Sequence, residues 1–457
     1  MSISSQSTAA AFISWFRKSR GTTIMANVGW QFTTKVVTTL LALAAAGFVA
    51  RRLGPEGLGL YRNTLALAGL LASFGLLVSQ QVLIQRMLRF PEREGQYLGT
   101  AMRIVGGAGL VVLAVAMAVP WQFDGTNARW MVVAAASYFL VFFMVPMAAW
   151  FESRMEGRML AMSNMAGLLL TRSWEIGCSI LGAGVLVFAF SQSLGLILMS
   201  VIVAFIFIRR RKASLKLSWN SGVARDLIFA SLPWAGLGIV NHAQLRSELF
   251  ILTYLKGAAA GGQYSAASEL MQPLLVVPGF LMSSLFPSVI RSYASDHALG
   301  QARMVQYVRL SAALGIGCSL GLALFGPTLA HLVYGSRFDA VAHLIRIIAW
   351  YVVPAFLAAP CVAWMVNENL GWLAAVYSVA GLVITVCLDL LLIPPFGVVG
   401  AAVASPLAGL VIGAVVPLCH PRTRWLAFTQ WRALVWPVPD LHAIVPVKTS
   451  PEQKNGD

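Results

Sequence analysis

The sequence predicts an all-α integral membrane protein in which about 12 transmembrane helices form two pseudo-symmetric six-helix lobes around a central cavity. Three observations support this fold class. The 457 residues are 58% hydrophobic and only 11% charged, whereas soluble domains carry about 25% charged residues. Many apolar runs exceed the roughly 18 residues that indicate a spanning helix. A glycine-rich stretch between such runs occurs twice, as RRLGPEGLGLY and as KGAAAGGQY.

The repeated glycine stretch predicts a helix–turn–helix unit that is used twice. In both copies a glycine, Gly54 or Gly257, precedes a tyrosine, Tyr61 or Tyr264, by seven positions. Glycine adopts backbone angles that other residues avoid, so it suits a tight connection between packed helices. A soluble helical protein is excluded because the chain has too little polar sequence to cover its surface.

The chain begins with a short apolar piece followed by Arg17, Lys18 and Arg20. A secretory signal has its charges before the apolar run, so we expect a helix on the membrane surface instead. The expected organisation is an interfacial segment at 1–23, an N-lobe at 24–208, a basic connector at 209–227, a C-lobe at 228–419 and a tail at 420–457. We place the spans near 24–50, 61–84, 101–121, 130–151, 159–181, 185–208, 228–255, 263–287, 305–326, 341–366, 371–393 and 397–419.

Basic residues fall mainly on one side of the predicted membrane. With a cytoplasmic N-terminus, the cytoplasmic side holds most arginines and lysines, including the run Arg209 to Lys212. Because such residues accumulate in cytoplasmic loops, we expect both termini in the cytoplasm. The formal net charge of +16 then reflects topology, and no nucleic-acid partner is expected. The opposite side holds Arg51, Arg52, Arg62, Arg129, Lys256 and Arg337.

The two halves match beyond the glycine turn. A shift of 214 positions carries Pro146, Trp150, Gly157 and Gly167 onto Pro360, Trp364, Gly371 and Gly381, and Glu175 onto Asp389. Six spans per half is an even number, so both halves cross the membrane in the same sense. The repeat is therefore expected to be parallel, with an axis along the membrane normal and a substrate site between the halves.

Three stretches carry a family resemblance: FVARRLGPEGLGLY, YGSRFDAVAHLIRIIAW and LLIPPFGVVGAAVAS. They resemble the polysaccharide flippase family of the multidrug/oligosaccharidyl-lipid/polysaccharide exporter superfamily, which moves O-antigen, capsule or exopolysaccharide precursors, and the resemblance covers nearly the whole chain. It implies a two-lobed transporter with alternating access, located in the bacterial inner membrane. The implied cargo is a polyprenyl-diphosphate-linked oligosaccharide, flipped to the outer leaflet, and the implied partners are the lipid bilayer, a polysaccharide polymerase and export machinery.

Intramembrane cations are the expected cargo site, because a charge facing lipid is expensive. In the first span, Gln31 and Lys35 lie on one polar stripe, which we expect to face the cavity. In the seventh span, Asn241, His242 and Arg246 form a polar segment, although amides at such positions also serve as glue between helices. In the tenth span, Arg346 and Trp350 align at helical spacing, which suits either a phosphate and a sugar ring or a cation–π contact without function. We expect Lys35, Arg246, Arg346, His242, Gln31, Asn241 and Trp350 to bind the diphosphate-linked cargo.

Four intramembrane acids are candidates for ion coupling: Glu248, Glu175, Asp389 and Glu269. Glu248 lies one helical turn from Gln244 within the polar seventh span. Glu175 follows Arg172 by three positions, so the two charges are predicted to neutralise each other. Glu269 and Asp389 are solitary in the sequence, and each could also be protonated and silent.

Enzymatic chemistry is not expected. The five cysteines have neither metal-ligand nor disulfide spacing, and the chain has no Walker phosphate loop and no HExxH cluster. We therefore predict neither metal nor cofactor. Two alternatives to the flippase stay open: a cation or drug antiporter of the same superfamily, and a membrane glycosyltransferase or polymerase, which the short predicted outer connections disfavour.

Overall fold

The chain folds entirely into helices over the part that the structure describes. A computed structural model describes the backbone of residues 22–118, 142, 144–210, 217–368 and 370–439, without side chains for 22–36. Nine helices in this part are long and apolar enough to cross a membrane. One of them, Val37–Arg89, contains two helices joined at Gly54. The all-α membrane fold is thus confirmed, and the number of about 12 spans stays a prediction.

The first lobe contains the helices up to Arg210. They are α2 (Thr22–Gly75), α3 (Gln80–Arg89), η1 (Pro91–Arg93), α4 (Glu94–Ala118), a helical segment at 144–153, α6 (Gly157–Ile180) and α7 (Val185–Arg210). Helices α6 and α7 pack against each other and against α2. They meet at residues 181–184, a boundary that the sequence left open between this position and the polar stretch FSQS at 190–193.

The second lobe begins with α8 and ends with a short helix after the last predicted span. Its elements are α8 (Ser221–Lys256), α9 (Ala258–Met271), η3 (Leu274–Val276), α10 (Val277–Ser295), α11 (His297–Tyr334), η4 (Ser336–Phe338), α12 (Asp339–Ile348), η5 (Ala349–Tyr351), α13 (Val352–Asn367), α14 (Gly371–Phe396), α15 (Val398–Leu410), a π-turn at Val411–Val415, a 3-10 turn at Val416–Cys419 and α16 (Arg424–Val435). Asn220 starts α8 and Asp296 starts α11, because each side chain accepts a backbone N–H of the first helical turn.

The repeated glycine turns are much shorter than the seven-residue stretches suggested. Gly54 and Gly257 have positive φ angles of 69° and 89°, and the next helix begins immediately, at Pro55 and at Ala258. Tyr61 and Tyr264 therefore lie inside helices instead of opening them. Two predicted continuous spans are also interrupted. The second breaks at 76–79, and the eighth breaks near Pro273, which cannot donate a helical hydrogen bond.

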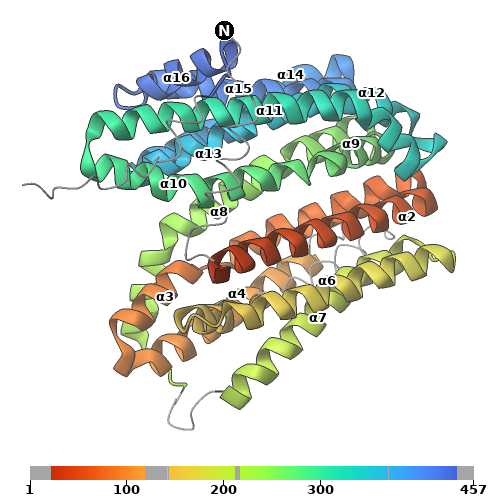
Figure 1. Cartoon of the computed structure of the whole chain (residues 1–457). Coiled ribbons are helices and arrows are strands. Elements are labelled where there is room, and N and C mark those ends of the chain that lie inside the picture. Colours follow the sequence, from red (N-terminus) through yellow and green to blue (C-terminus); the bar gives the residue numbers. More distant parts are fainter. Residues whose placement is uncertain (1–21, 119–141, 143, 211–216, 369, 440–457) are drawn as a thin grey trace, which may run out of the picture.

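The two ends of the molecule differ in composition. All glycines with positive φ among the described residues lie in turns at one end, which we call the glycine end: Gly54, Gly182, Gly257, Gly335 and Gly397. At the opposite, basic end, ion pairs tie neighbouring helices together, such as Arg86–Asp226 and Arg154–Glu94. Figure 1 shows the lobes converging at the end where α2 and α9 meet and diverging toward the end that carries α3.

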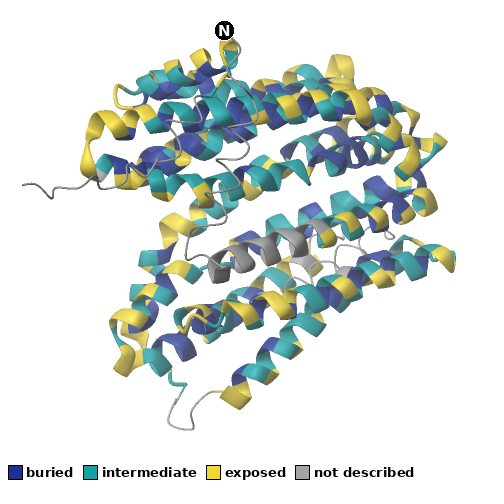
Figure 2. Cartoon of the chain, in the orientation of Figure 1, coloured by how far each residue is buried: buried dark blue, intermediate teal, exposed yellow. Residues whose placement is uncertain are grey.

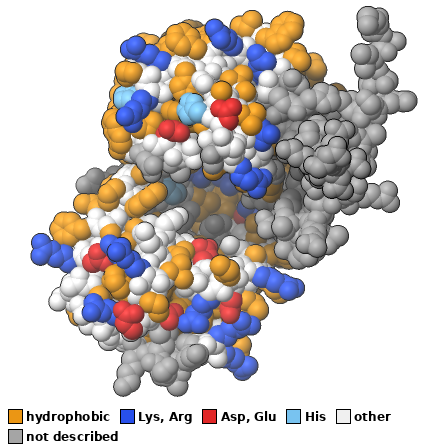
Figure 3. Space-filling view, turned by 60° about the vertical axis from the view of Figure 1, so that its left-hand side comes forward, with side chains coloured by type: hydrophobic (Ala, Val, Ile, Leu, Met, Phe, Trp, Pro, Cys, Tyr) orange, Lys and Arg blue, Asp and Glu red, His pale blue; other side chains and the backbone are white. Residues whose placement is uncertain are grey.

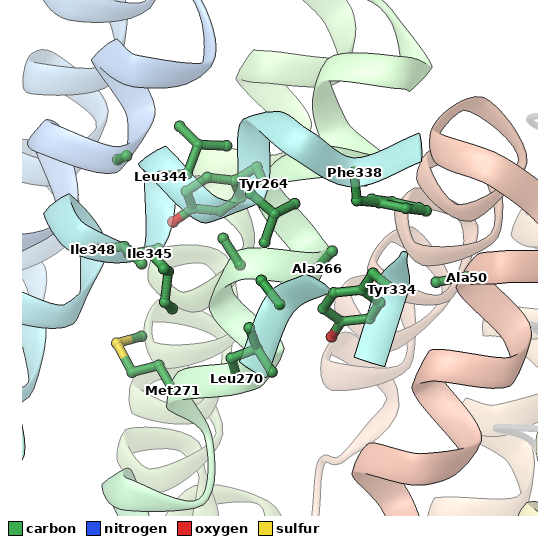
Figure 4. Close-up of a cluster of buried hydrophobic side chains, with 14 of the residues drawn as sticks. Ala50, Tyr264, Ala266, Leu270, Met271, Tyr334, Phe338, Leu344, Ile345 and Ile348 are labelled. Atoms are coloured by element: carbon green, nitrogen blue, oxygen red, sulfur yellow. The ribbon is translucent and has the colours of Figure 1, made fainter. Parts of the chain in front are cut away.

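The largest buried cluster joins the lobes near the glycine end. It combines Ala50 and Tyr61 of α2 with Tyr264 of α9, Phe338 of η4 and Ile345 of α12. Figure 4 shows several of these side chains meeting between α2, α9 and α12. In Figure 2, the buried residues follow the inner faces of the helices, and exposed residues cover the outer faces. This cluster holds the lobes together at the glycine end. Toward the basic end, one cluster fills the N-lobe and includes Val223 and Leu227 from the first turns of α8, and another fills the C-lobe.

Candidate functional site

Glu175 is the centre of a buried polar site inside the N-lobe. Its side chain is only 1% exposed. Arg172 Nη1 lies 2.7 Å from its Oε2 atom, so the predicted neutralising pair is present. The hydroxyls of Tyr61 and Ser191 donate to Oε1 at 3.2 and 3.1 Å. Glu175 is thus a carboxylate with both oxygens satisfied, as burial of a charge requires.

Asp389 occupies the equivalent position in the C-lobe, but its surroundings differ. The side chain is 0% exposed, and Ser247 Oγ lies 3.5 Å from its Oδ2 atom. Glu248 is close enough for its charge to interact with that of Asp389. Tyr264 donates to Glu248 and lies 2.9 Å from Ser405 Oγ. Asp389 is therefore not solitary, as its isolation in the sequence suggested, because the fold places a second carboxyl beside it.

The two acid sites are copies of one arrangement with different charge. The shift of 214 positions relates Ser191 to Ser405 as well as Glu175 to Asp389, and a tyrosine from the helix after the glycine turn completes each site. The N-lobe copy contains Arg172, whose equivalent in the C-lobe is Val386. Among the described residues, the C-lobe copy contains two carboxyls and no cation in contact with either. The N-lobe site is therefore neutralised internally, whereas the C-lobe site is not.

Glu269 pairs across the interface between the lobes. It forms an ion pair with Arg62 of α2, and the two side chains are 21% and 20% exposed. Glu269 is thus not solitary either. From the sequence, Arg62 counts among the basic residues on the outer side of the membrane. The helix restarts at Pro55, so Arg62 lies about two turns after its start.

Arg51 and Arg52, which break the expected charge asymmetry, have structural partners at the glycine end. Arg51 donates to the carbonyl oxygens of Leu332 and Val333 at the end of α11, across the lobe interface. Arg52 donates to the carbonyls of Gly182 and Ala183 after α6. Carbonyls at a helix C-terminus lack helical partners and attract cations. These two arginines therefore connect helix ends.

The predicted cargo residues on α8 and α12 are exposed. Arg246, His242 and Asn241 of α8 and Arg346 of α12 have exposed side chains. Trp350 in η5 is 43% exposed. Within the described part of the chain, neither Arg246 nor Arg346 has an ion-pair partner. His242 and Arg246 are close enough to interact electrostatically, as expected for residues four apart on one helix.

The remaining two cargo residues, Gln31 and Lys35, lie on α2, but their side chains are outside the described residues. Figure 3 shows the molecule hollowed between its two halves, with Lys and Arg side chains at the edge of the hollow. No group of three or more His, Cys, Asp and Glu side chains in the described ranges could hold a metal ion. The described cysteines are all free.

Sequence reasoning missed the hydroxyl groups of the acid sites and the cation of the lobe interface. From the sequence alone, Ser191 has no assigned role, and Tyr61 and Tyr264 serve only as markers of the repeat. The signal was present for the serines, because the shift that pairs Glu175 with Asp389 also pairs Ser191 with Ser405. No sequence signal pairs Arg62 with Glu269, since they belong to different lobes.

Comparison with known proteins gives a family for this chain. The family described as "Polysaccharide biosynthesis protein" matches residues 24–293. No curated protein matches the sequence. An inward-facing multidrug resistance MATE family transporter of the MOP superfamily has a TM-score of 0.65 at 15% identity, covering 87% of this chain and 95% of the other.

Two further structures have the same fold. The lipid II flippase MurJ in an inward closed conformation has a TM-score of 0.66 at 12% identity, covering 88% of this chain and 90% of that one. A MOP superfamily transporter from Pyrococcus furiosus, described as having a binding pocket of reversed polarity, has a TM-score of 0.59 at 16% identity, covering 88% and 94%. At these identities the likeness concerns the fold. The match over more than half of its length shows that this chain belongs to the polysaccharide biosynthesis protein family, and its fold is that of the MOP superfamily.

Proposed function

We propose that this protein flips a polyprenyl-diphosphate-linked oligosaccharide from the cytoplasmic to the outer leaflet of the bacterial inner membrane. The family is described by polysaccharide biosynthesis, and a structural neighbour is described as a lipid II flippase. The fold contributes two lobes with a hollow between them (Figure 3). By the distribution of basic residues, the basic end faces the cytoplasm, so the lobes diverge toward the side where the cargo is made.

The observation that carries this proposal is the separation of charges within the spans. The acids Glu175 and Asp389 are buried inside the lobes, and Glu269 is paired at the lobe interface. Within the predicted spans 228–255 and 341–366, the exposed charged side chains are those of Arg246 and Arg346. An arginine that faces hydrocarbon is unfavourable by about 2.5–3.5 kcal/mol at least, so these side chains belong to the hollow.

Exposed arginines suit an anionic cargo better than a cationic one. A guanidinium offers a planar fork of donors that matches phosphate oxygens, and each such contact contributes about 1.5–3 kcal/mol. We assign the diphosphate to Arg246, Arg346 and Lys35, supported by His242, Gln31, Asn241 and Trp350. An antiporter for organic cations would instead expose its acids, so the charge distribution disfavours that alternative.

The test of this proposal is export of polysaccharide by arginine variants at matched protein levels. Arg246→Ala should lose most export, and Arg246→Lys should recover part of it, since lysine keeps the charge but not the fork. Arg225→Ala is the matched control, because Arg225 is an exposed arginine near the start of the same helix. In cells that carry Arg246→Ala, the lipid-linked oligosaccharide should accumulate in the cytoplasmic leaflet. Full export by the Lys35→Ala, Arg246→Ala and Arg346→Ala variants alike would contradict an anionic cargo.

We further propose that transport is coupled to an ion gradient through Glu248 and Asp389. Two neighbouring carboxyls in a poorly hydrated site repel each other strongly when both are ionised. A proton or a sodium ion removes that repulsion. In the N-lobe, Arg172 already neutralises Glu175, so that site needs no bound ion to balance its charge. This contrast between the lobes supports the C-lobe as the site of coupling.

A further inference from the structure

The N-lobe contains a cavity that is lined in part by α2, the helix that carries Lys35. Its volume is about 360 Å³, and its walls come from α2, α6 and α7. Small-ligand pockets usually measure about 300–1,000 Å³, so the cavity is large enough for a sugar ring. Thr38 of α2 lines it, three positions after Lys35 and therefore on nearly the same face of that helix. The cavity thus lies one helical turn along α2 from the position of Lys35.

The cavity walls combine apolar side chains with a few polar groups. Leu168, Leu196 and Met199 supply apolar surface, and Asn164, Thr171 and Arg172 supply polar atoms. The side chain of Asn164 is exposed and offers both donors and an acceptor. A membrane protein does not leave such groups facing lipid without cost. The polar groups indicate that a polar ligand or water occupies this space.

Arg172 lines this cavity. One of its nitrogens, Nη1, is paired with Glu175, whereas Nε is buried in the protein and has no acceptor among the described residues. A guanidinium has five N–H donors, so Arg172 can donate to a ligand in the cavity while it stays paired with Glu175.

The electrostatics of the cavity favour a neutral, oxygen-rich ligand. The charge of Arg172 is already balanced by Glu175 at 2.7 Å, so the cavity offers hydrogen bonds without net charge. A phosphate would be held better by the unpaired Arg246 and Arg346. A sugar ring presents hydroxyl oxygens for Asn164 and Arg172, and carbon–hydrogen faces for the leucine and methionine side chains.

Two of the polar lining residues, Asn164 and Arg172, are not repeated in the C-lobe. The shift of 214 positions relates Asn164 to Ser378 and Arg172 to Val386. In the C-lobe, the Gln244 side chain lies against Gly381, the equivalent of Gly167 in the cavity wall. We therefore propose that this cavity binds a sugar ring of the cargo, next to the diphosphate, with Asn164 and Arg172 as the residues that recognise it. This inference rests on the proposed flippase function.

The test compares two probes in vesicles containing the full chain: polyprenyl diphosphate carrying one hexose, and polyprenyl diphosphate without sugar. The wild-type protein should flip the sugar-bearing probe faster. Asn164→Ala should slow that probe roughly tenfold, the loss expected for one or two hydrogen bonds, and leave the sugar-free probe unchanged. Ala161→Phe, which fills the cavity from its wall, should have the same selective effect.

Matched controls come from the other lobe. Ala375→Phe and Ser378→Ala change the equivalent positions of α14 and should leave both probes unchanged. Arg172→Lys keeps a charge beside Glu175 but removes the additional guanidinium donors, so it should also slow only the sugar-bearing probe. Equal slowing of both probes, or none, by all three cavity variants would overturn the sugar site while leaving the flippase function intact. Failure of the wild-type protein to flip either probe would instead reject the function itself.

Discussion

At the scale of single residues, the contrast between the two acid sites is the most informative feature of the molecule. Glu175 has an arginine at 2.7 Å, whereas Asp389 has a second acid, Glu248, within electrostatic range. One oxygen of Asp389, Oδ1, is buried without a hydrogen-bond partner among the described residues. A bound proton or sodium ion would satisfy that oxygen and remove the repulsion between the carboxyls.

We predict that Glu248→Gln and Asp389→Asn abolish gradient-dependent transport and leave membrane insertion intact. Each amide is close in shape to the acid but cannot exchange a proton and binds sodium weakly. The measurement is flipping of the sugar-bearing probe in vesicles with an imposed pH gradient or, separately, an imposed sodium gradient. The gradient that accelerates the wild-type protein identifies the ion.

Glu56→Gln is the control for these variants, because Glu56 is an exposed carboxylate at the glycine end. It should respond to the gradient as the wild-type protein does. A normal response by both Glu248→Gln and Asp389→Asn would remove this acid pair from the mechanism.

Sequence reasoning identified the local partner of Glu175 but not the distant partners of Glu248 and Glu269. The pair Arg172–Glu175 was predictable because it is local, three positions apart on one helix. The proximity of Glu248 to Asp389 depends on how α8 packs against α14, and that of Arg62 to Glu269 on how the lobes meet. Neither contact leaves a periodic signal in the sequence.

At the scale of helices, α2 and α9 are the elements that join the lobes. They approach each other through glycines: a Cβ atom on Gly262 would lie 1.8 Å from the carbonyl oxygen of Pro55, and one on Gly59 would lie 1.8 Å from that of Ala258. Backbones at this separation leave no space for a side chain. Small residues allow such close packing of membrane helices.

We predict that Gly262→Ala and Gly59→Ala force α2 and α9 apart and reduce export. Overpacking at a tight contact is unfavourable by about 1–3 kcal/mol, and here the obstacle is backbone, which cannot rotate away. Gly317→Ala is the matched control, since a Cβ atom at this position of α11 meets nothing within 4 Å. The measurement is polysaccharide export at matched protein levels. Equal export by Gly262→Ala, Gly59→Ala and Gly317→Ala would show that this contact is dispensable.

Helix boundaries were predictable from the sequence where a repeated glycine turn sets them. Gly54 and Gly257 lie at turns between helices, as the repeat predicts, although both turns are shorter than expected. The break near Pro273 and the one at 76–79 were not predicted, because the apolar runs continue through them. The hydropathy of a segment reflects its contact with lipid. A local break in the helix leaves that hydropathy unchanged, so hydropathy alone does not show the break.

At the scale of the whole molecule, the lobes are joined at the glycine end and separate toward the basic end (Figure 1). Alternating access requires the reverse state, in which the glycine end opens. The interactions that must then break are the cluster around Tyr264 and Phe338, the hydrogen bonds of Arg51 to the end of α11, and the ion pair Arg62–Glu269. The ion pair is the contact whose loss can be repaired by exchange of its residues.

We predict that Arg62→Gln shifts the protein toward the state that is open at the glycine end. The ion pair is partly buried, so removing one partner is unfavourable by up to about 3–5 kcal/mol, the value for a fully buried pair, because Glu269 is left without its cation. The penalty applies only while the lobes are closed there, since opening hydrates Glu269. The exchanged variant Arg62→Glu/Glu269→Arg should restore much of the closed state.

The measurement is labelling of Asn241→Cys by an impermeant maleimide added from the side of the glycine end, with the native cysteines replaced. Asn241 is exposed on α8 and belongs to the proposed cavity, so its labelling reports whether that cavity is open to the glycine end. Labelling should be slow in the wild-type background, fast with Arg62→Gln and slow again with the exchanged pair. Export should fall with Arg62→Gln, since a transporter held in one state does not cycle. Labelling that is equally slow in all three backgrounds would mean that the buried cluster around Tyr264 and Phe338 closes this end without the ion pair. The ion pair would then only neutralise two charges at the lobe interface.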